Sequence, residues 1–252
     1  MLRSRIIPCL LVHKNGLVKT TNFTSPKYVG DPINAVKIFN EKEVDELVVL
    51  DIDASKYNTE PNFNLISNLA VECRMPFCYG GGIKTVEHAE KIINLGVEKI
   101  AISSAAIDDI DICNKIGNAI GFQSLSVVID VKKNFFSGYT IYTNNGKNKS
   151  SIEFNKILKE LDNLNVGEII INSIDNDGLM KGYDMKLADY VRNICNRPLT
   201  ILGGAGNLND VKSLITKYKI IGAAAGSLFV FKGKYKAVLI NYPNRKEKLS
   251  LY

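Results

Sequence analysis

The sequence lacks tryptophan and contains only two histidines, His13 and His88, in 252 residues. Neither histidine belongs to a cluster with cysteines, which argues against a zinc site, and we expect no metal and no cofactor. Five cysteines form no C-x-x-C pair, and their odd number argues against a disulfide framework. The first ten residues, MLRSRIIPCL, show no signal-peptide pattern, and no apolar run is long enough to span a bilayer. We therefore expect a cytoplasmic protein with reduced thiols and no membrane contact.

The excess of basic over acidic residues is small, with a net charge of +6 and a pI near 8.9. Lysine and arginine are scattered rather than clustered, which favours a phosphorylated or acidic small-molecule ligand and argues against nucleic acid. Hydrophobic residues make up 46% of the chain and charged residues 23%, as in a soluble globular protein with a large core. Length alone does not choose between two ordinary domains and one α/β barrel.

Short apolar runs alternate with amphipathic stretches along the whole chain. Eight strands are predicted, at 5–11, 46–51, 76–80, 98–103, 124–130, 168–173, 198–202 and 219–224. Stretches such as 31–44 and 85–96 lie between them, with apolar spacings of three and four that are typical of helices. Regular alternation predicts an α/β fold with a parallel sheet, and eight units predict a closed (β/α)₈ TIM barrel. The alternative is an open doubly wound sheet.

An internal repeat favours the barrel. Residues 76–106 align with residues 198–229 once a one-residue insertion is allowed. Matched pairs mark the repeat: Gly82 with Gly204, Ser104 with Ser227, and Asp53 with Asp175. We therefore predict one domain over 1–252, built from two half-barrels at approximately 1–122 and 123–252. Residues 133–150 break the rhythm, and their alternating aromatics around Ser137-Gly138 and the Asn145-Gly146 turn predict a hairpin excursion.

Glycine and serine follow the strands of both repeats at the end where barrel loops bind ligands. Glycine lets backbone N–H groups approach an anion closely, and a helix N-terminus favours negative charge. The candidate phosphate-binding residues are Gly81, Gly82, Ser104, Gly203, Gly204, Gly226 and Ser227. Because the two sets are symmetric, we expect a small-molecule ligand with phosphates at both ends. The alternative is that these glycines only make tight turns.

Several stretches together resemble the cyclase subunit of imidazole glycerol phosphate synthase, the HisF family, over roughly residues 1–235. They are RIIPCL, VGDPINAVKIFNEKEVDELVVLDIDAS, YGGGIKTVEHA, IDVKK, GEIIINSIDNDG, GGAGNL and AAAGSLF. The resemblance implies a barrel that pairs with a HisH-like glutamine amidotransferase at its N-terminal face. Ammonia from that partner would cross the barrel and attack a bis-phosphorylated ribulosyl aminoimidazole, giving imidazole glycerol phosphate and an aminoimidazole ribotide. The resemblance also adds Asp177 and Gly178 to the phosphate-binding set and makes Lys19 a residue of a mobile substrate loop.

Only one of the two aspartates that such cyclases use is present in this sequence. Asp130 matches the acid at the end of strand 5, but Leu11 stands where the strand-1 acid is expected. Because a general acid or base is typically worth ~10²–10⁴-fold, its loss should nearly silence ring closure. The alternative is rescue by a neighbour, His13 in the loop after strand 1 or Asp51. Two further mouth positions depart from the family: Asn172 replaces a threonine and Leu202 a serine.

A ring of charges at the opposite end of the barrel matches the family completely. If Leu11 points inward, alternation along the strand also points Arg5 inward, at the N-terminal end. The family's ammonia gate corresponds to Arg5, Glu46, Lys99 and Glu168. Above it, the same alternation predicts an inner lining of Cys9, Val48, Cys78, Ala101, Val128, Ile170 and Thr200. The alternative is that the four charges merely stabilise the lower face.

The sequence at residues 9–12, 28–40 and 225–243 resembles a divergent branch of this family that is associated with acetamidino-sugar formation in surface polysaccharides. That branch implies delivery of ammonia to a sugar amidotransferase at the C-terminal face. Three interpretations follow. The chain is an ammonia-conducting barrel without cyclase activity, a working cyclase that tolerates Leu11, or a phosphate-binding barrel whose gate charges are only structural.

Overall fold

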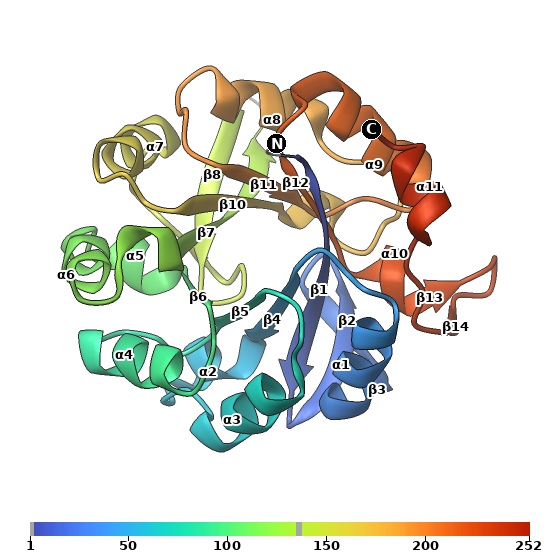
Figure 1. Cartoon of the computed structure of the whole chain (residues 1–252). Helices are drawn as coiled ribbons and strands as arrows, with labels where there is room; N and C mark the ends of the chain where they lie inside the picture. The colour runs from blue at the N-terminus through green and yellow to red at the C-terminus, as the bar shows by residue number, and fades with distance from the viewer. Residues whose placement is uncertain (1–2, 135–137) are drawn as a thin grey trace.

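Eight parallel strands close into a barrel in the computed structural model, which describes residues 3–134 and 138–252 (Figure 1). The barrel strands are β1 Arg5–His13, β4 Leu47–Asp51, β5 Phe77–Gly80, β6 Lys99–Ile102, β7 Leu125–Asn134, β10 Glu168–Ser173, β11 Leu199–Leu202 and β12 Gly222–Ala225. Pairing of β1 with β12 and of β7 with β10 closes the circle. The predicted (β/α)₈ TIM barrel is therefore confirmed, and the open doubly wound sheet is excluded.

Helices form the outer ring around the strands (Figure 1). They are α1 Pro32–Glu41, α2 Ile52–Tyr57, α3 Phe63–Glu72, α4 Val86–Asn94, α5 Ser104–Asp108, α6 Asp111–Ile120, α7 Phe154–Asn163, α8 Met185–Arg192, α9 Leu208–Tyr218, α10 Ser227–Val230 and α11 Arg245–Leu249. Short 3₁₀ turns occupy η1 Phe122–Ser124 and η2 Ile174–Asn176. Local chemistry sets several starts: the Asp31 carboxylate accepts from Asn34 N at 2.8 Å, and the Thr85 hydroxyl accepts from His88 N at 3.2 Å. Among the described residues, no helix is long and apolar enough to cross a membrane.

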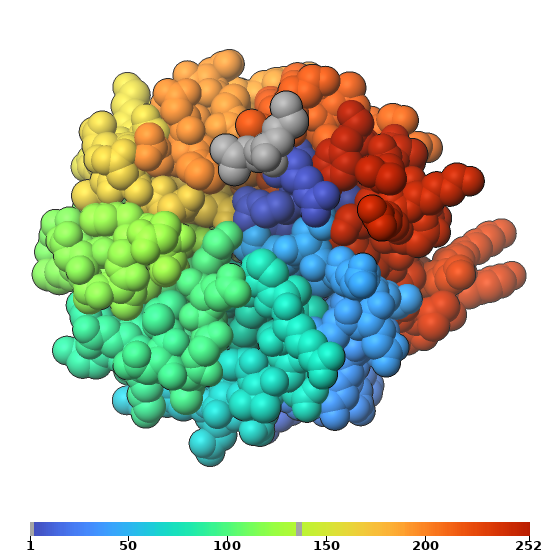
Figure 2. Space-filling view, viewed as in Figure 1, coloured from blue at the N-terminus to red at the C-terminus, as the bar shows by residue number. Residues whose placement is uncertain are grey.

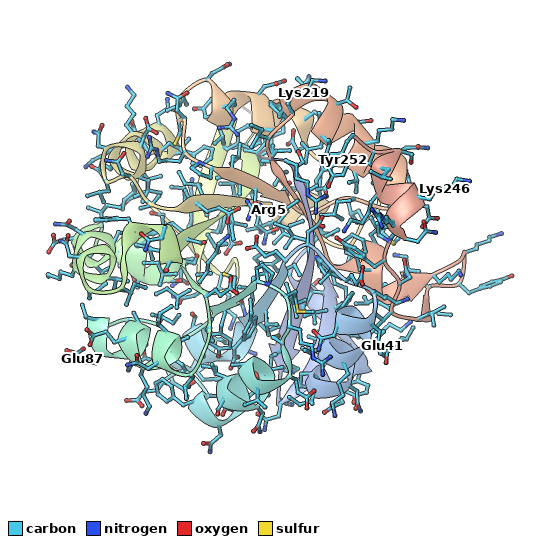
Figure 3. The ribbon with its side chains drawn as sticks, viewed as in Figure 1. Arg5, Glu41, Glu87, Lys219, Lys246 and Tyr252 are labelled. Carbon is cyan, nitrogen blue, oxygen red and sulfur yellow. The ribbon has the colours of Figure 1, made fainter. Side chains whose placement is uncertain are left out.

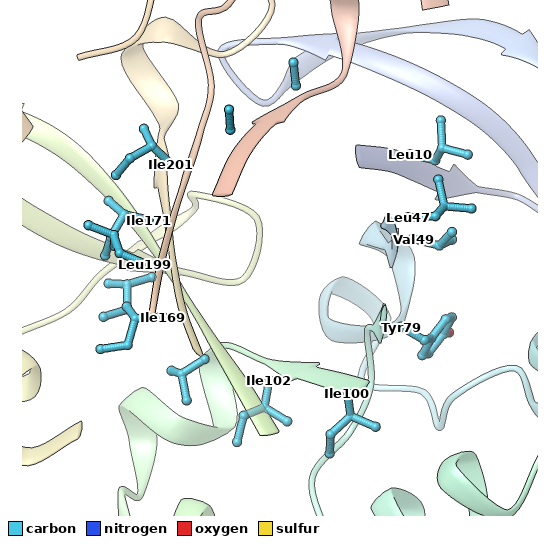
Figure 4. Packing of buried hydrophobic residues seen from close by; sticks show 14 of the residues in the cluster. Leu10, Leu47, Val49, Tyr79, Ile100, Ile102, Ile169, Ile171, Leu199 and Ile201 are labelled. Atoms are coloured by element: carbon cyan, nitrogen blue, oxygen red, sulfur yellow. The ribbon is translucent and has the colours of Figure 1, made fainter. Parts of the chain in front are cut away.

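Side chains alternate along the strands between two separate apolar clusters. The larger cluster lies between the sheet and the helices, and Figure 4 shows Leu47, Val49 and Tyr79 among its members. The smaller cluster fills the barrel interior and includes Val48, the residue between Leu47 and Val49 on β4. Burial on both faces explains the nearly continuous apolar runs that the sequence shows.

Two antiparallel hairpins extend the sheet beyond the barrel. β2 Gly16–Thr21 pairs with β1 and with β3 Thr24–Gly30. β8 Gly138–Thr143 pairs with β7 and with the short β9 Asn148–Lys149, within the predicted excursion at 133–150; Ser137 lies outside the described residues. The first hairpin was not predicted. The assignment of His13 and Lys19 to a loop was wrong, because β1 continues to His13 and Lys19 lies in β2.

The turn from β1 into β2, which was not predicted, has a clear local cause. Lys14 and Asn15 adopt φ values of 48° and 62°, which produces a tight turn that leads directly into Gly16. An Asn-Gly pair between apolar runs is a strong hairpin signal, and here it follows the apolar end of β1.

The described residues that precede β1 and the C-terminus of the chain lie on the face at which the barrel strands begin (Figure 1). The space-filling view of this face shows the hairpin of β13 Phe231–Lys232 and β14 Ala237–Val238 projecting at the side (Figure 2). The division into half-barrels at 1–122 and 123–252 stays a prediction.

Candidate functional site

A cavity of about 600 Å³ opens at the carboxyl ends of the barrel strands. The structure brings together there every predicted catalytic, substrate-loop and phosphate-binding position: Leu11, Lys19, Gly81, Gly82, Ser104, Asp130, Asp177, Gly178, Gly203, Gly204, Gly226 and Ser227. Ligands bind at this end in (β/α)₈ barrels because eight loops converge there. Of the predicted site residues, Arg5, Glu46, Lys99 and Glu168 do not line the cavity and lie at the opposite end of the barrel interior.

Asp130 projects from β7 into the cavity wall. Burial raises the pKa of Asp130 to about 7, although a hydrogen bond from Asn172 opposes that rise. Asn172 Nδ2 donates to Asp130 Oδ1 at 2.9 Å, whereas Asn172 Oδ1 is buried without a partner among the described residues. A carboxyl group that titrates near neutral pH is able to donate or accept a proton at this point.

Leu11 lies on the cavity wall with Leu50, its partner in the β1–β4 ladder. Leu202 extends this apolar part of the wall. The position expected to hold a second acid is thus occupied by hydrocarbon that continues the apolar cluster of the barrel interior.

Asp51 and His13 are the two residues predicted as possible replacements for the missing acid. Asp51 Oδ1 caps α2, accepting from Asp53 N at 2.9 Å and from Ala54 N at 3.2 Å. His13 Nδ1 lies 2.8 Å from an Asp53 carboxylate oxygen, and His13 does not line the main cavity. His13 therefore lies away from the main cavity, whereas Asp51 lines it, caps α2 through Oδ1 alone, and has a pKa that burial raises above its ordinary value.

Lys19 extends from β2 across the mouth and forms a buried ion pair with Asp177. Asp177 Oδ2 also accepts from the Thr20 hydroxyl at 2.7 Å and from Phe23 N at 3.2 Å. Gly226 permits this arrangement, since a Cβ at that position would lie 2.9 Å from the Lys19 side chain. The β2–β3 hairpin is thereby fastened to the segment after β10, and it covers part of the cavity.

The glycines of the two candidate phosphate loops are also required by close backbone packing. Gly81 and Gly204 have φ values of +124° and +108°, which side chains rarely adopt. A Cβ on Gly81 would approach Asp51 O to 2.5 Å, and one on Gly204 would approach Gly182 O to 2.1 Å. Backbone packing alone therefore requires glycine at these two positions, as the tight-turn alternative holds. It does not account for the fact that both loops line the same cavity.

Three lysines of the cavity were not predicted from the sequence: Lys56, Lys84 and Lys147. Each follows the end of a strand by several residues, and only the closed barrel brings them to one mouth. The lining also contains Asp51, Asp108, Asp130 and Asp177, so the cavity offers cations to a phosphorylated ligand without an excess of positive charge. Among the described residues, no group of three or more His, Cys, Asp or Glu side chains could hold a metal ion.

Four charged side chains form a closed ring at the amino-terminal ends of the strands. Arg5 bonds to Glu46 and to Glu168, the latter at 2.7 Å, and Figure 3 shows Arg5 near the barrel axis. Lys99 Nζ lies 3.0 Å from Glu46 and 3.2 Å from Glu168. Burial alone would raise the pKa of Glu168, but Arg5 and Lys99 lower it below its ordinary value. The Thr200 hydroxyl also donates to Glu168. Through the ion pairs of the ring, each of the four charges has a partner of opposite sign.

A mostly apolar section separates this ring from the cavity. It consists of Ile7, Cys9, Val48, Cys78, Ala101, Val128, Ile170, Leu202 and Ala224. Six of the seven residues predicted for the inner lining are members, and the seventh, Thr200, faces the same interior at the level of the ring. Cys9, Ala101 and Val128 also border the cavity, so the cavity floor lies within this section.

Fold and site together define a (β/α)₈ barrel with a cavity lined by glycine loops, lysines and aspartates at one end and a closed ring of opposite charges at the other. The family model described as "Histidine biosynthesis protein" matches residues 5–236. A "Putative imidazole glycerol phosphate synthase subunit hisF3" from Vibrio vulnificus (strain YJ016) is 55% identical over 249 residues, covering 98% of this chain and 96% of that protein. A "Putative imidazole glycerol phosphate synthase subunit HisF" from Leptospira borgpetersenii is 53% identical over 253 residues, covering all of both chains. The "Imidazole glycerol phosphate synthase subunit HisF" of Dictyoglomus thermophilum (strain ATCC 35947 / DSM 3960 / H-6-12) is 36% identical over 231 residues, covering 92% and 91%.

The chain belongs to the HisF family and is a HisF-like subunit of the imidazole glycerol phosphate synthase type.

Proposed function

We propose that this barrel receives ammonia from a HisH-like glutamine amidotransferase and conducts it to the C-terminal cavity, where it serves amidination of a surface-polysaccharide sugar. In this role the barrel carries ammonia and does not close an imidazole ring. The observation that carries the proposal is the contrast at the cavity wall: Asp130 is present with a pKa near 7, and Leu11 faces the same space with no proton to exchange.

Ring closure would need proton transfer on both sides of the forming ring. Asp177 is paired with Lys19, so it does not replace the lost acid without breaking a contact seen here. Asp51 lines the cavity with a raised pKa, and it is the carboxyl that would have to take that part in a working cyclase. A substrate phosphate could compete for Lys19, but that would leave Asp177 as a buried carboxylate and would not supply an acid at Leu11.

Conduction, by contrast, needs only an inlet, a lining and an outlet, and the chain retains residues for each. Arg5, Glu46, Lys99 and Glu168 would form the inlet, which must open because the ring is closed by ion pairs. The apolar section above the ring would favour neutral ammonia over ammonium, since burying an unpaired charge is costly.

The cavity would hold the acceptor or a phosphorylated relative of it. We assign phosphate contacts to the loops that carry Gly81, Gly82 and Ser104 on one side and Gly203, Gly204, Gly226 and Ser227 on the other, with Asp177 and Gly178 at the edge. Their convergence on one cavity that also presents Lys56, Lys84 and Lys147 supports this assignment. The sugar amidotransferase at the C-terminal face rests on the resemblance of residues 225–243 to the acetamidino-sugar branch.

A second candidate function is the cyclase reaction of histidine biosynthesis. It is favoured by the complete cavity, which keeps Asp130 and both glycine pairs, and by the similarity to a protein named as an imidazole glycerol phosphate synthase subunit. The two candidates make opposite predictions about turnover.

The deciding experiment supplies the purified barrel with ammonium salts and the ribulosyl aminoimidazole substrate, which removes any need for a glutaminase. We expect negligible imidazole glycerol phosphate from the natural chain and a measurable rate from Leu11→Asp. Leu50→Asp is the matched control, since it places the same charge on the neighbouring strand without restoring the strand-1 acid. Turnover by the natural chain at the rate of an ordinary cyclase would refute the conduit proposal. A cognate glutaminase that neither binds the barrel nor is stimulated by it would support the third interpretation, in which the ring is structural.

A further inference from the structure

The C-terminal segment Asn241–Tyr252 lies against the same end of the barrel as the charged ring. Figure 3 shows Tyr252 beside the start of β1, on the face that also exposes Arg5. The Tyr252 hydroxyl donates to Ser4 O at 3.0 Å, and Leu251 is buried. The segment therefore packs against the residues that immediately precede Arg5.

Tyr242 occupies the place of a missing sheet bond between β1 and β4. The ladder between these strands begins at the pair Cys9 and Val48, and three residues earlier its register would pair Ile6 with Asp45. In place of a direct bond, the Tyr242 hydroxyl donates to Ile6 O at 2.8 Å and accepts from Asp45 N at 3.1 Å. One phenolic oxygen thus bridges the two strands at their lower ends.

Asp45 provides a second connection at the same level. Its Oδ2 accepts from Ile6 N at 3.0 Å, and its Oδ1 forms an ion pair with Lys248 of α11 at 2.6 Å. Lys248 Nζ also lies 5.4 Å from the centre of the Tyr242 ring. The ring itself packs on Phe229, with centroids 5.4 Å apart, so the bridging hydroxyl has little freedom.

The bridged residues are the immediate neighbours of two members of the charged ring. Arg5 precedes Ile6, and Glu46 follows Asp45, so the separation fixed by Tyr242 is also the separation across which Arg5 reaches Glu46. A change of one hydrogen-bond length at this bridge would alter the geometry of the ion pair.

We propose that the C-terminal segment is a clasp, with Tyr242 and Lys248 as positioning residues that hold the charged ring in its closed arrangement. The inference rests on the proposed function for the role of the ring as an ammonia inlet. Its structural content, control of access to the barrel interior from below, is testable without a partner, so the two can fail separately.

Cysteines within the chain provide the readout. Cys78 is fully buried in the apolar section, next to the level of the ring. Cys9 borders the cavity and reports access from the opposite end, and Cys113, buried in the outer core, reports global unfolding. Peptide mass spectrometry resolves the rate at which a small uncharged thiol reagent modifies each of these cysteines. The three rates distinguish access through the charged ring, access through the cavity and global unfolding.

For Tyr242→Phe we expect the modification rate of Cys78 to rise about tenfold, because both hydrogen bonds of the bridge are lost. The rates of Cys9 and Cys113 should change less than twofold. Tyr218→Phe is the matched control, since its hydroxyl bonds to Asp189 at 2.6 Å on the outer helices, away from the ring. Lys248→Gln keeps Tyr242 and should give a smaller rise at Cys78, which provides a milder variant if Tyr242→Phe folds poorly. An unchanged Cys78 rate in both variants, or a rise that Cys113 matches, would overturn the proposal.

Discussion

Replacing Asp130 with asparagine should stabilise the protein at neutral and alkaline pH. The carboxamide preserves the shape of the side chain and its hydrogen bond to Asn172, while it removes a charge whose formation burial opposes. The pKa of Asp130 is about 7 in the folded chain, whereas an unfolded aspartate titrates near 3.9. The effect on stability follows from this difference.

The sign is fixed by which state releases its proton first. At low pH the carboxyl is neutral in both states and costs nothing. As the pH rises above about 4, the unfolded chain loses its proton while the folded chain keeps it, so the stability of the natural chain falls until about pH 7 and is then constant. At about 1.4 kcal/mol per pKa unit, the full cost is roughly 4 kcal/mol, and more than half of it develops between pH 5 and pH 8.

Urea unfolding followed by far-ultraviolet circular dichroism at several pH values measures this cost, and the optical method suits a chain without tryptophan. The difference in unfolding free energy between Asp130→Asn and the natural chain should grow by roughly 2 to 3 kcal/mol over that interval. Asp189→Asn is the matched control: hydrogen bonds from Lys217 and Tyr218 lower the pKa of Asp189, so the effect of that variant should be nearly constant over the same interval. A pH-independent difference for Asp130→Asn would refute the assignment of a buried, proton-exchanging carboxyl to the cavity.

Three further predictions address the ring, the hairpin and the barrel wall. Glu168→Gln should lower the unfolding free energy by about 3 kcal/mol because it leaves Arg5 short of a carboxylate, and an unchanged urea midpoint would contradict the ion-paired ring. Lys19→Met should speed proteolysis within residues 16–30, since Asp177 then loses its buried partner, and an unaltered cleavage pattern would show that the hairpin is held by other contacts. Gly222→Ala should lower the melting temperature sharply, because its Cβ would lie 1.7 Å from the Thr200 hydroxyl. A near-natural melting temperature would mean that β11 and β12 can move apart to accept the methyl group at little cost.

The sequence predicted the barrel and the composition of its two ends well, because both depend on short-range patterns. Alternation along strands is enough to place Arg5 and Leu11 on one inward face, at opposite ends of β1. Duplication of glycine motifs is enough to predict that two loops share one cavity, as Gly82 and Gly204 do.

What could not be predicted depends on contacts between residues that are remote in the chain. The Lys19–Asp177 pair joins residues 158 positions apart, and nothing near either residue indicates the other. Likewise, only the geometry of α2 shows that Asp51 caps this helix through Oδ1 while its side chain lines the cavity. The turn between β1 and β2 is different, since its Asn15-Gly16 pair was visible in the sequence.

The positions of the two antiparallel hairpins have a consequence for how members of such a family can diverge. Both are appended to the carboxyl-terminal end of the barrel, β2–β3 after β1 and β8–β9 after β7, and neither contributes a residue to the charged ring. Segments 16–30 and 138–150 can therefore acquire insertions or new side chains at the cavity mouth while the charged ring stays unaltered. Exchange of these segments between relatives is accordingly a route to a chimera that keeps the charged ring of one relative and takes the cavity mouth of the other.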